Sequence, residues 1–181
     1  PRATTHMKIF PRTEFGDPIL RAKAKPVPLV LVKKSGFPKL IAGMFHTMRR
    51  ADGIGLAAPQ IGLSYQLAVI QLAPTKHRKT LKASEKLALI NPKLIRASKN
   101  KAYDWEGCLS LDGVRGKVPR HKTITVRYTD ERGVAHTRTV TGFLARVFQH
   151  EIDHLNGTLY VDRMENMKTL STITEFRKRA K

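Results

Sequence analysis

The sequence predicts an α+β fold, in which mostly antiparallel β-sheets pack around a central helix that carries an H-E-x-x-H motif. Two patterns lead to this prediction. Residues 143–155 place apolar side chains three and four positions apart, the spacing of an amphipathic helix. Residues 123–129 and 134–141 are rich in Thr and Val and flank a short polar stretch, the pattern of a β-hairpin. The length of 181 residues suits one domain with a single hydrophobic core.

The first half of the chain predicts one helix and two strands. The helix is expected over 38–51, where Met, Phe, Leu and Ile side chains share one face. The glycine-rich run 53–62 suggests a tight turn between a helix and a strand. Strands are expected over 66–72 and 87–95. The polar, lysine-rich stretch 73–86 between them is expected to be an exposed loop with room for a short helix.

The second half begins with the hairpin, whose turn is Asp130-Glu131-Arg132-Gly133. The helix over 143–155 ends before Asn156-Gly157, a pair that commonly stops helices. A last helix is expected over 167–179, because Leu170, Ile173 and Phe176 have helical spacing. The sequence contains no internal repeat and no domain linker.

The run Gln149-His150-Glu151-Ile152-Asp153-His154 contains the H-E-x-x-H motif. On a helix the two histidines are one turn apart and project from one face, so that one cation can bind both rings. Glu151 lies beside that face, where it can act as the general base of metal-assisted hydrolysis. The alternative is a pair of surface histidines. The histidines continue the apolar face, however, and burying imidazoles without a partner is costly.

The third metal ligand is not decided by this motif. A metzincin would have a histidine at position 160, where this chain has Tyr160. A gluzincin would use a downstream glutamate, and the candidate Glu175 lies in a basic stretch. Upstream, Cys108 is the only cysteine and is framed by glycines. A lone cysteine is more often a small buried apolar residue than a ligand.

Three segments together closely resemble the peptide deformylase family. They are G-I-G-L-A-A-P-Q at 53–60, E-G-C-L-S at 106–110 and Q-H-E-I-D-H-L-N-G at 149–157. The resemblance extends from about Ile9 to Met164. It implies a metal-dependent hydrolase that removes the formyl group from the N-terminal N-formylmethionine of nascent polypeptides and releases formate. Many members have a proline shortly after E-G-C-L-S, whereas this chain has Asp112-Gly113, as in a subgroup of organellar and some bacterial enzymes.

The resemblance implies a role for each matching residue. The three protein ligands of one divalent metal ion would be Cys108, His150 and His154. Glu151 would act as base and then as acid, and the oxyanion would be stabilised by the Gln60 amide and the Leu109 backbone N–H. In similar enzymes the metal is often Fe²⁺, and Zn²⁺, Ni²⁺ or Co²⁺ also bind, as the thiolate and imidazole donors allow.

The same resemblance implies where the substrate binds. The peptide would pair with the backbone at Ile54 and Gly107, and Gly55 and Gly107 would let that backbone come close to the metal. The methionine side chain would enter an apolar pocket formed by Phe143, Val147 and the stem of Arg146. Phe143 and Val147 could equally be plain core residues. Arg115 and Arg120 are expected to be peptide contacts, solvated charges or partners of Glu106.

Composition limits the partners and the compartment. One cysteine excludes an internal disulfide framework and is consistent with a reducing compartment. No stretch approaches the roughly 20 apolar residues of a membrane span, so no membrane partner is expected. The expected location is the bacterial cytoplasm, or an organelle if a transit sequence was removed. Three parts are expected: residues 1–6 as a remnant of cloning, a catalytic domain over 7–166, and a basic C-terminal helix or tail over 167–181.

The net charge of +20, from 34 basic and 14 acidic residues, implies attraction to polyanions. The C-terminal tail or the loop 76–82 is expected to bind transiently to ribosomal RNA, where the substrate emerges. Aromatic residues are few and scattered, so specific DNA binding is not expected. Two other functions remain open at this point, an H-E-x-x-H endopeptidase and a ribosome- or RNA-binding protein on an inactive deformylase fold.

Overall fold

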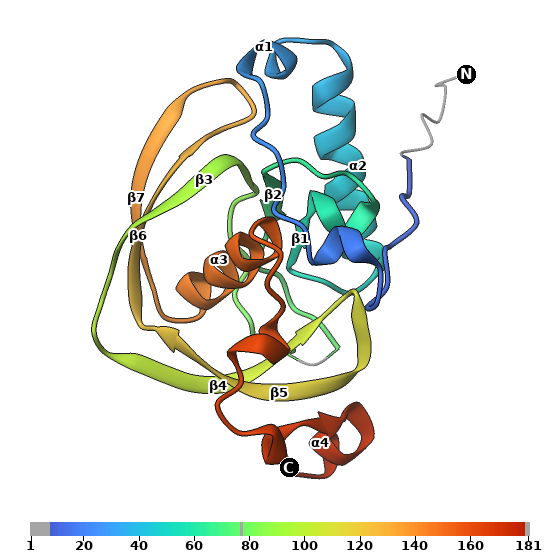
Figure 1. Cartoon of the computed structure of the whole chain (residues 1–181), viewed down its shortest axis with the longest axis vertical. Helices are drawn as coiled ribbons and strands as arrows, with labels where there is room; N and C mark the ends of the chain where they lie inside the picture. The colour runs from blue at the N-terminus through green and yellow to red at the C-terminus, as the bar shows by residue number, and fades with distance from the viewer. Residues whose placement is uncertain (1–7, 77, 180–181) are drawn as a thin grey trace.

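The computed structural model describes residues 8–76 and 78–179, and these form two antiparallel sheets with helices packed on them (Figure 1). The five-stranded sheet has the order β1-β2-β3-β6-β7. Its strands are β1 Gly55–Ala57, β2 Leu67–Ile70, β3 Leu87–Ala97, β6 Thr123–Thr129 and β7 Ala135–Thr141. The three-stranded sheet has the order β4-β5-β8. Its strands are β4 Lys101–Cys108, β5 Leu111–His121 and β8 Ser171–Thr172.

The long helices bury their apolar faces against the five-stranded sheet. Helix α2 (Gly36–Arg50) contributes Met44 and Met48 to a core cluster that also contains residues of β1 and β2. Helix α3 (Gly142–Leu155) contributes Phe148 to a second cluster with Ile124 and Val126 of β6. These two clusters hold most of the buried apolar side chains, so each long helix packs on the sheet over a cluster of its own.

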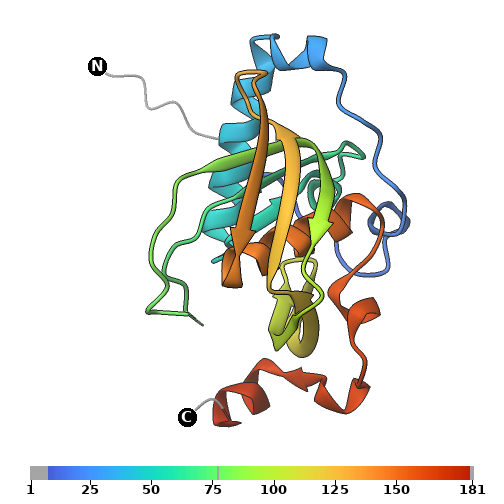
Figure 2. The ribbon, with the colours of Figure 1, turned by 90° about the vertical axis from the view of Figure 1, so that its left-hand side faces the viewer.

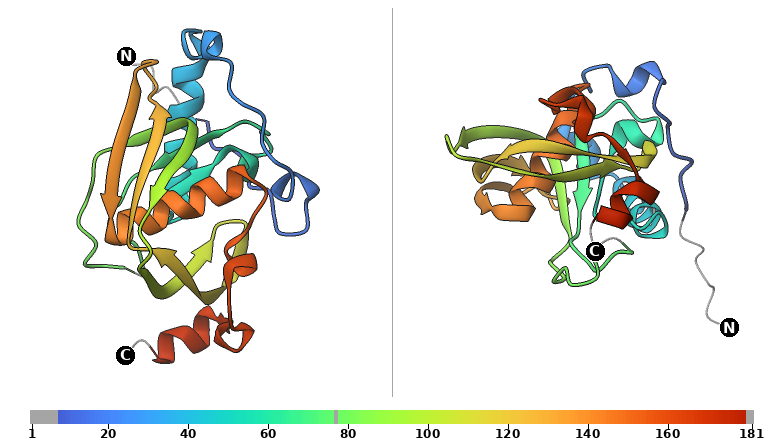
Figure 3. Two further views of the ribbon diagram at one scale, coloured as in Figure 1. Left: turned by 60° about the vertical axis from the view of Figure 1, so that its left-hand side comes forward. Right: turned by 90° about the horizontal axis from the view of Figure 1, so that it is seen from below.

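Helix α3 also contacts β5, so it touches strands of both sheets. Figure 2 shows it behind β3, β6 and β7 when the five-stranded sheet faces the viewer. Figure 3 shows the C-terminal helix α4 (Ile173–Arg179) at the end of the molecule where β4 and β5 lie. The remaining helices are short. They are η1 Pro18–Leu20, α1 Leu29–Val32, η2 Ala58–Ile61, η3 Tyr160–Arg163 and η4 Met167–Thr169.

The α+β class predicted from the sequence is confirmed. The helix predicted over 143–155 is α3, and the hairpin predicted over 123–141 is β6 and β7 with Asp130–Gly133 as its turn. The run 53–62 contains β1 and η2 rather than a simple turn. No helix occurs within the described part of the loop 73–86.

The helix predicted over 167–179 is wrong in its first half. That stretch forms a 3₁₀ turn and then β8, and α4 begins only at Ile173. The physical reason lies across the chain: β8 pairs with β5 through Val114↔Thr172 and Arg115↔Ser171. Helical spacing of three apolar residues could not reveal a strand partner so distant in sequence. The expected cloning remnant, residues 1–6, lies outside the described residues.

None of the helices that the structure describes has both the length and the apolar character needed to cross a membrane.

Candidate metal centre

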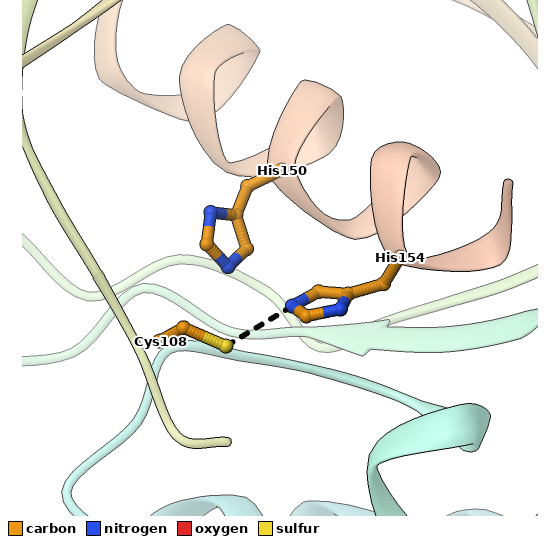
Figure 4. Close-up of side chains that lie close together, drawn as sticks. All are labelled: Cys108, His150 and His154. Atoms are coloured by element: carbon orange, nitrogen blue, oxygen red, sulfur yellow. Dashed lines mark hydrogen bonds between the residues drawn. The ribbon is translucent and has the colours of Figure 1, made fainter. Parts of the chain in front are cut away.

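Helix α3 and the end of β4 bring one thiol and two imidazoles together. His150 and His154 are one helical turn apart, and their ring centroids are separated by 4.9 Å. Cys108 ends β4, and its Sγ lies 3.2 Å from His154 Nε2. The candidate ligand atoms of the three residues all lie within 4.8 Å of one another (Figure 4). This spacing allows one ion to contact all three.

The donor set fits a catalytic metal ion. One thiolate and two imidazoles suit Zn²⁺, Fe²⁺ and other first-row ions, and three protein ligands leave one coordination position for water or substrate. A buried atom beside the cluster, Glu151 Oε2, has no hydrogen-bond partner among the described residues. An unpaired buried polar atom is costly, so its presence here marks a place where something else binds.

The gluzincin alternative is not supported by the position of Glu175. Its side chain is half exposed on α4 and pairs with Lys178 at 2.6 Å. The group of potential metal-binding residues found in the described part of the chain contains Cys108 and the two histidines, not Glu175. Cys108 is therefore the third residue that the fold offers to a metal.

A buried carboxylate orients the first histidine. Glu106 Oε2 lies 2.9 Å from His150 Nδ1, so the other ring nitrogen of His150 is left to face the cluster. Arg120 forms two hydrogen bonds to Glu106, at 2.9 and 3.0 Å, and Arg146 forms a third at 2.7 Å. Burial alone would raise the pKa of Glu106, but hydrogen bonds from His150 and Arg120 hold it well below its usual range.

The same network joins α3 to the β4–β5 hairpin. Arg120 on β5 also binds Asp153 on α3 at 2.5 Å. The Arg146 guanidinium donates to the carbonyl oxygens of Ala102 at 2.6 Å and Val118 at 2.8 Å. Removing one partner of such a buried network commonly costs about 3–5 kcal/mol, because a charge is left uncompensated. The helix that carries both histidines is thus fixed in position relative to the strand that carries Cys108.

Glu151 sits beside the cluster with almost no solvent exposure. A Cβ atom added at Gly55 would lie 2.2 Å from Glu151 Oε1, so only glycine leaves room for this carboxylate. Burial raises the pKa of Glu151 to about 7, and the nearby histidines offset only part of that effect. A carboxyl group with a pKa near neutrality can both accept and return a proton at that pH.

Cys108 lies among hydrogen-bond donors. Burial alone would raise the pKa of its thiol, but His154 and His150 hold that pKa well below its usual value. The thiolate is the form that binds metals. The Gln60 amide nitrogen donates to Cys108 Sγ at 3.4 Å and to Ser110 Oγ at 3.3 Å. Its carbonyl oxygen accepts from Ala57 N–H at 2.8 Å, which turns the amino end toward the cluster.

The cluster opens into a cavity of about 490 Å³. All the site residues expected from the sequence line this cavity except His154, which is 1% exposed and lies beneath it. The lining residues that were expected are Ile54, Gly55, Gln60, Gly107, Cys108, Leu109, Phe143, Arg146, Val147, His150 and Glu151.

The lining also includes residues that sequence reasoning did not single out. Trp105 and Arg78 contribute to the wall, and the Arg78 guanidinium stacks 4.2 Å from the centroid of the Phe143 ring. Ile173, Phe176 and Arg177 of α4 line the same cavity. No local motif marks these positions, because they reach the site only through the pairing of distant segments.

Arg115 and Arg120, expected to be peptide contacts, solvated charges or partners of Glu106, have different surroundings. Arg120 is buried and is a partner of Glu106, so it is neither a solvated charge nor part of the cavity lining. Arg115 does line the cavity. A Cβ atom at Gly107 would lie 1.7 Å from Arg115 Nη1, so this glycine makes room for the guanidinium.

The chain matches known proteins over most of its length. Residues 10–170 match the family model for polypeptide deformylase. Peptide deformylase 2 of Nostoc is 41% identical over 168 residues, which cover 93% of this chain and 92% of the relative. Peptide deformylase of Chlorobaculum parvum is 44% identical over 175 residues, covering 93% and 90% respectively.

Solved structures with the same fold agree. A class I type b peptide deformylase from Acinetobacter baumannii, bound to Met-Ala-Ser, superimposes with a TM-score of 0.84 at 31% identity, covering 87% of this chain and 99% of that one. A peptide deformylase from Synechococcus elongatus in complex with actinonin has a TM-score of 0.76 at 40% identity, covering 88% and 81% respectively. The chain therefore belongs to the peptide deformylase family, metallo-hydrolases with a single catalytic metal ion that remove the N-formyl group from nascent polypeptides.

Proposed function

We propose that this chain deformylates N-formylmethionyl peptides through a metal ion held by Cys108, His150 and His154. The observation that carries this assignment is the convergence of their ligand atoms within 4.8 Å, beside a buried carboxylate and at the base of a cavity. When bound, a divalent ion supplies a Lewis acid that lowers the pKa of water toward neutrality and polarises a carbonyl group. We assign Fe²⁺ as the native ion, with Zn²⁺, Ni²⁺ or Co²⁺ as substitutes in purified protein.

Glu151 is the general base and acid of the proposed reaction. Its carboxylate takes a proton from the attacking water, which adds to the formyl carbon. The same carboxyl group then gives the proton to the leaving amine, and formate is released. The pKa of about 7 and the unpaired Oε2 suit a group that must gain and lose a proton in one turnover.

Gln60 and Leu109 stabilise the negative charge that develops on the formyl oxygen. The Gln60 amino group is already turned toward Cys108 by the hydrogen bond from Ala57. The Leu109 N–H follows Cys108 directly in the chain. Donors fixed in advance need no reorganisation during the reaction. Removing one of them typically raises the activation barrier by about 3 kcal/mol.

The peptide binds as an extended strand between β1 and the open edge of β4. In this arrangement Ile54 and Gly107 offer backbone hydrogen bonds to the substrate. The methionine side chain lies against Phe143 and Val147. Arg146 contributes to the same wall with its side-chain stem, because its guanidinium is held by Glu106 and by backbone carbonyls.

The catalytic unit of this proposal spans residues 7–166, and residues 167–181 form a basic C-terminal segment. The high positive charge supports transient binding to the RNA surface of the ribosome, where formylated chains emerge. The proposed compartment is the bacterial cytoplasm, since the relatives named above are bacterial proteins.

Formate release from formyl-Met-Ala-Ser tests the proposed function. Protein loaded anaerobically with Fe²⁺ is expected to release formate, and a chelator that removes the metal is expected to abolish the release. Adding Fe²⁺ back should restore it. Release that persists after the metal content has fallen to background would contradict the proposal. Cleavage of an unformylated internal peptide bond would favour the endopeptidase alternative.

A further inference from the structure

The C-terminal segment reaches the catalytic cavity although it lies beyond the stretch that matches the family model. The family match ends at residue 170. Beyond it, Ile173, Phe176 and Arg177 line the same cavity as His150 and Glu151. The basic tail therefore contributes side chains to the site, in addition to any role of its charge.

Two sets of contacts hold α4 beside the site. Strand β8 pairs with β5 through Val114↔Thr172 and Arg115↔Ser171, directly before the helix begins. The Phe176 ring then meets the Trp105 ring of β4 edge to face, with centroids 5.0 Å apart and planes at 63°. Aromatic pairs of this geometry are favourable beyond their buried area. The part of the cavity lining that belongs to α4 is thus held against both strands of the hairpin that carries Cys108.

Only one face of α4 looks into the cavity. Ile173, Phe176 and Arg177 are spaced by three and four residues and so lie on the same side of the helix. Lys178 is two-thirds exposed and pairs with Glu175. Neither of these two residues lines the cavity, which gives the helix a matched position for a control substitution.

Side chains on β4 alternate between the two faces of the strand. This alternation decides which part of the peptide meets the cavity lining that α4 contributes. Glu106 and Cys108 point into the buried interior, so Trp105 and Gly107 face the opposite side. Arg115 and Phe176 lie on that opposite side, against Gly107 and Trp105 respectively. Successive side chains of an extended peptide along the β4 edge also alternate. With methionine directed toward Phe143 and Val147, the next side chain faces α4.

We propose that Phe176, together with Ile173 and Trp105, forms a subsite for the side chain of the second residue of the formylated peptide. The subsite is aromatic and aliphatic, so it favours a bulky apolar second residue over alanine. Phe176 is a specificity-determining residue in this view. The proposal rests on the substrate orientation of the proposed function, and the test below separates the two.

The test compares formate release from formyl-Met-Phe-Ser and formyl-Met-Ala-Ser. The unmodified chain is expected to prefer the first peptide in kcat/KM, mainly through a lower KM. Phe176→Ala is expected to reduce that preference by roughly fivefold, because apolar contact area is lost, so that kcat/KM should fall more for formyl-Met-Phe-Ser than for formyl-Met-Ala-Ser. Phe176→Leu should restore part of the preference. Lys178→Ala, on the opposite face of α4, should leave both peptides unaffected.

Other outcomes would overturn the proposal. Equal losses for both peptides in Phe176→Ala, accompanied by a lower unfolding temperature, would show a structural role only. An unchanged preference in Phe176→Ala would show that the second side chain does not touch α4. If the metal-loaded, unmodified chain released formate from neither peptide, the proposed function itself would fail, and this inference with it.

Discussion

Glu151 is the residue on which the proposed chemistry most depends, because it is buried and keeps one carboxylate oxygen unpaired. Glu151→Gln keeps the size of the side chain but cannot take a proton. We expect this variant to bind metal normally and to lose about 10²–10⁴-fold in kcat on formyl-Met-Ala-Ser, the usual contribution of general acid–base catalysis. Metal content by mass spectrometry and formate release measure the two properties separately. Near-normal turnover by Glu151→Gln would show that Glu151 is not the general base.

Cys108 and Glu175 are a second residue-scale comparison, since they are the two candidates for the third metal ligand. We expect Cys108→Ala to abolish tight metal binding, because the remaining histidines alone cannot fill the site. Glu175→Ala should bind metal as the unmodified chain does, since Glu175 already pairs with Lys178 on the surface. Equilibrium dialysis against Co²⁺ measures both. Loss of binding in Glu175→Ala with retention in Cys108→Ala would reverse the assignment.

At the scale of residues, sequence reasoning could place the two histidines and Glu151 because their relation is local. A four-residue spacing on one helix fixes their geometry wherever the helix lies. Cys108 has no such local relation to them, and the residues alone left it open between a ligand and a buried apolar residue. Its assignment needed the family resemblance, and its contact with His154 at 3.2 Å depends on the packing of β4 against α3.

At the scale of elements, α2, α3 and the β6–β7 hairpin were predictable, and the β4–β5 hairpin was not. The predictable elements bury apolar side chains at regular intervals, as Ile124, Val126 and Tyr128 do on β6. The β4–β5 hairpin buries Glu106 and Arg120 instead, so its inward positions look like solvent-exposed ones. Hydrophobic periodicity cannot detect a buried face made of paired charges.

The β6–β7 hairpin carries a prediction about stability and pH. Burial alone would raise the pKa of Asp130, but hydrogen bonds from His136, from the Val134 N–H and from Arg132 hold it well below its usual range. A carboxyl group with a lowered pKa stabilises the fold at any pH above its unfolded pKa of about 3.9, and that stabilisation fades as the pH falls below this value. We therefore expect Asp130→Asn to be less stable than the unmodified chain at pH 7.

The expected deficit for Asp130→Asn is about 1–2 kcal/mol in the free energy of unfolding, the range for hydrogen bonds to a charged group. It should be constant above about pH 5 and shrink steadily below pH 4. Urea unfolding at several pH values measures it, with Glu131→Gln at the neighbouring exposed position as the control. A deficit that grows on acidification would contradict the sign of the pKa shift.

At the scale of the whole molecule, the buried residues include four carboxylates but only two arginines and no lysine among the described residues. Glu106, Asp130 and Asp153 are buried and engage arginine side chains. The surface therefore carries a large excess of cations under the net charge of +20. Such a surface attracts polyanions through release of their counterions, which makes binding strongly dependent on salt.

The last prediction concerns where this charge acts. Lys79 and Lys82 lie in the loop between β2 and β3. Lys178 lies on α4, and Figure 3 places this helix at the end of the molecule that also holds β4 and β5. Lys33 and Lys34 follow α1, which Figure 1 places at the opposite end. If ribosomal RNA binds near the mouth of the cavity, the two groups of lysines should differ.

We expect the unmodified chain to pellet with ribosomes at about 50 mM salt and to be released by about 300 mM, because each neutralised phosphate steepens the salt dependence. Replacing Lys79 and Lys82 by Glu should weaken pelleting more than replacing Lys33 and Lys34 by Glu, although both changes remove the same charge. Equal weakening by the two pairs would mean that only net charge matters. Pelleting that persists at high salt would exclude an electrostatic contact altogether.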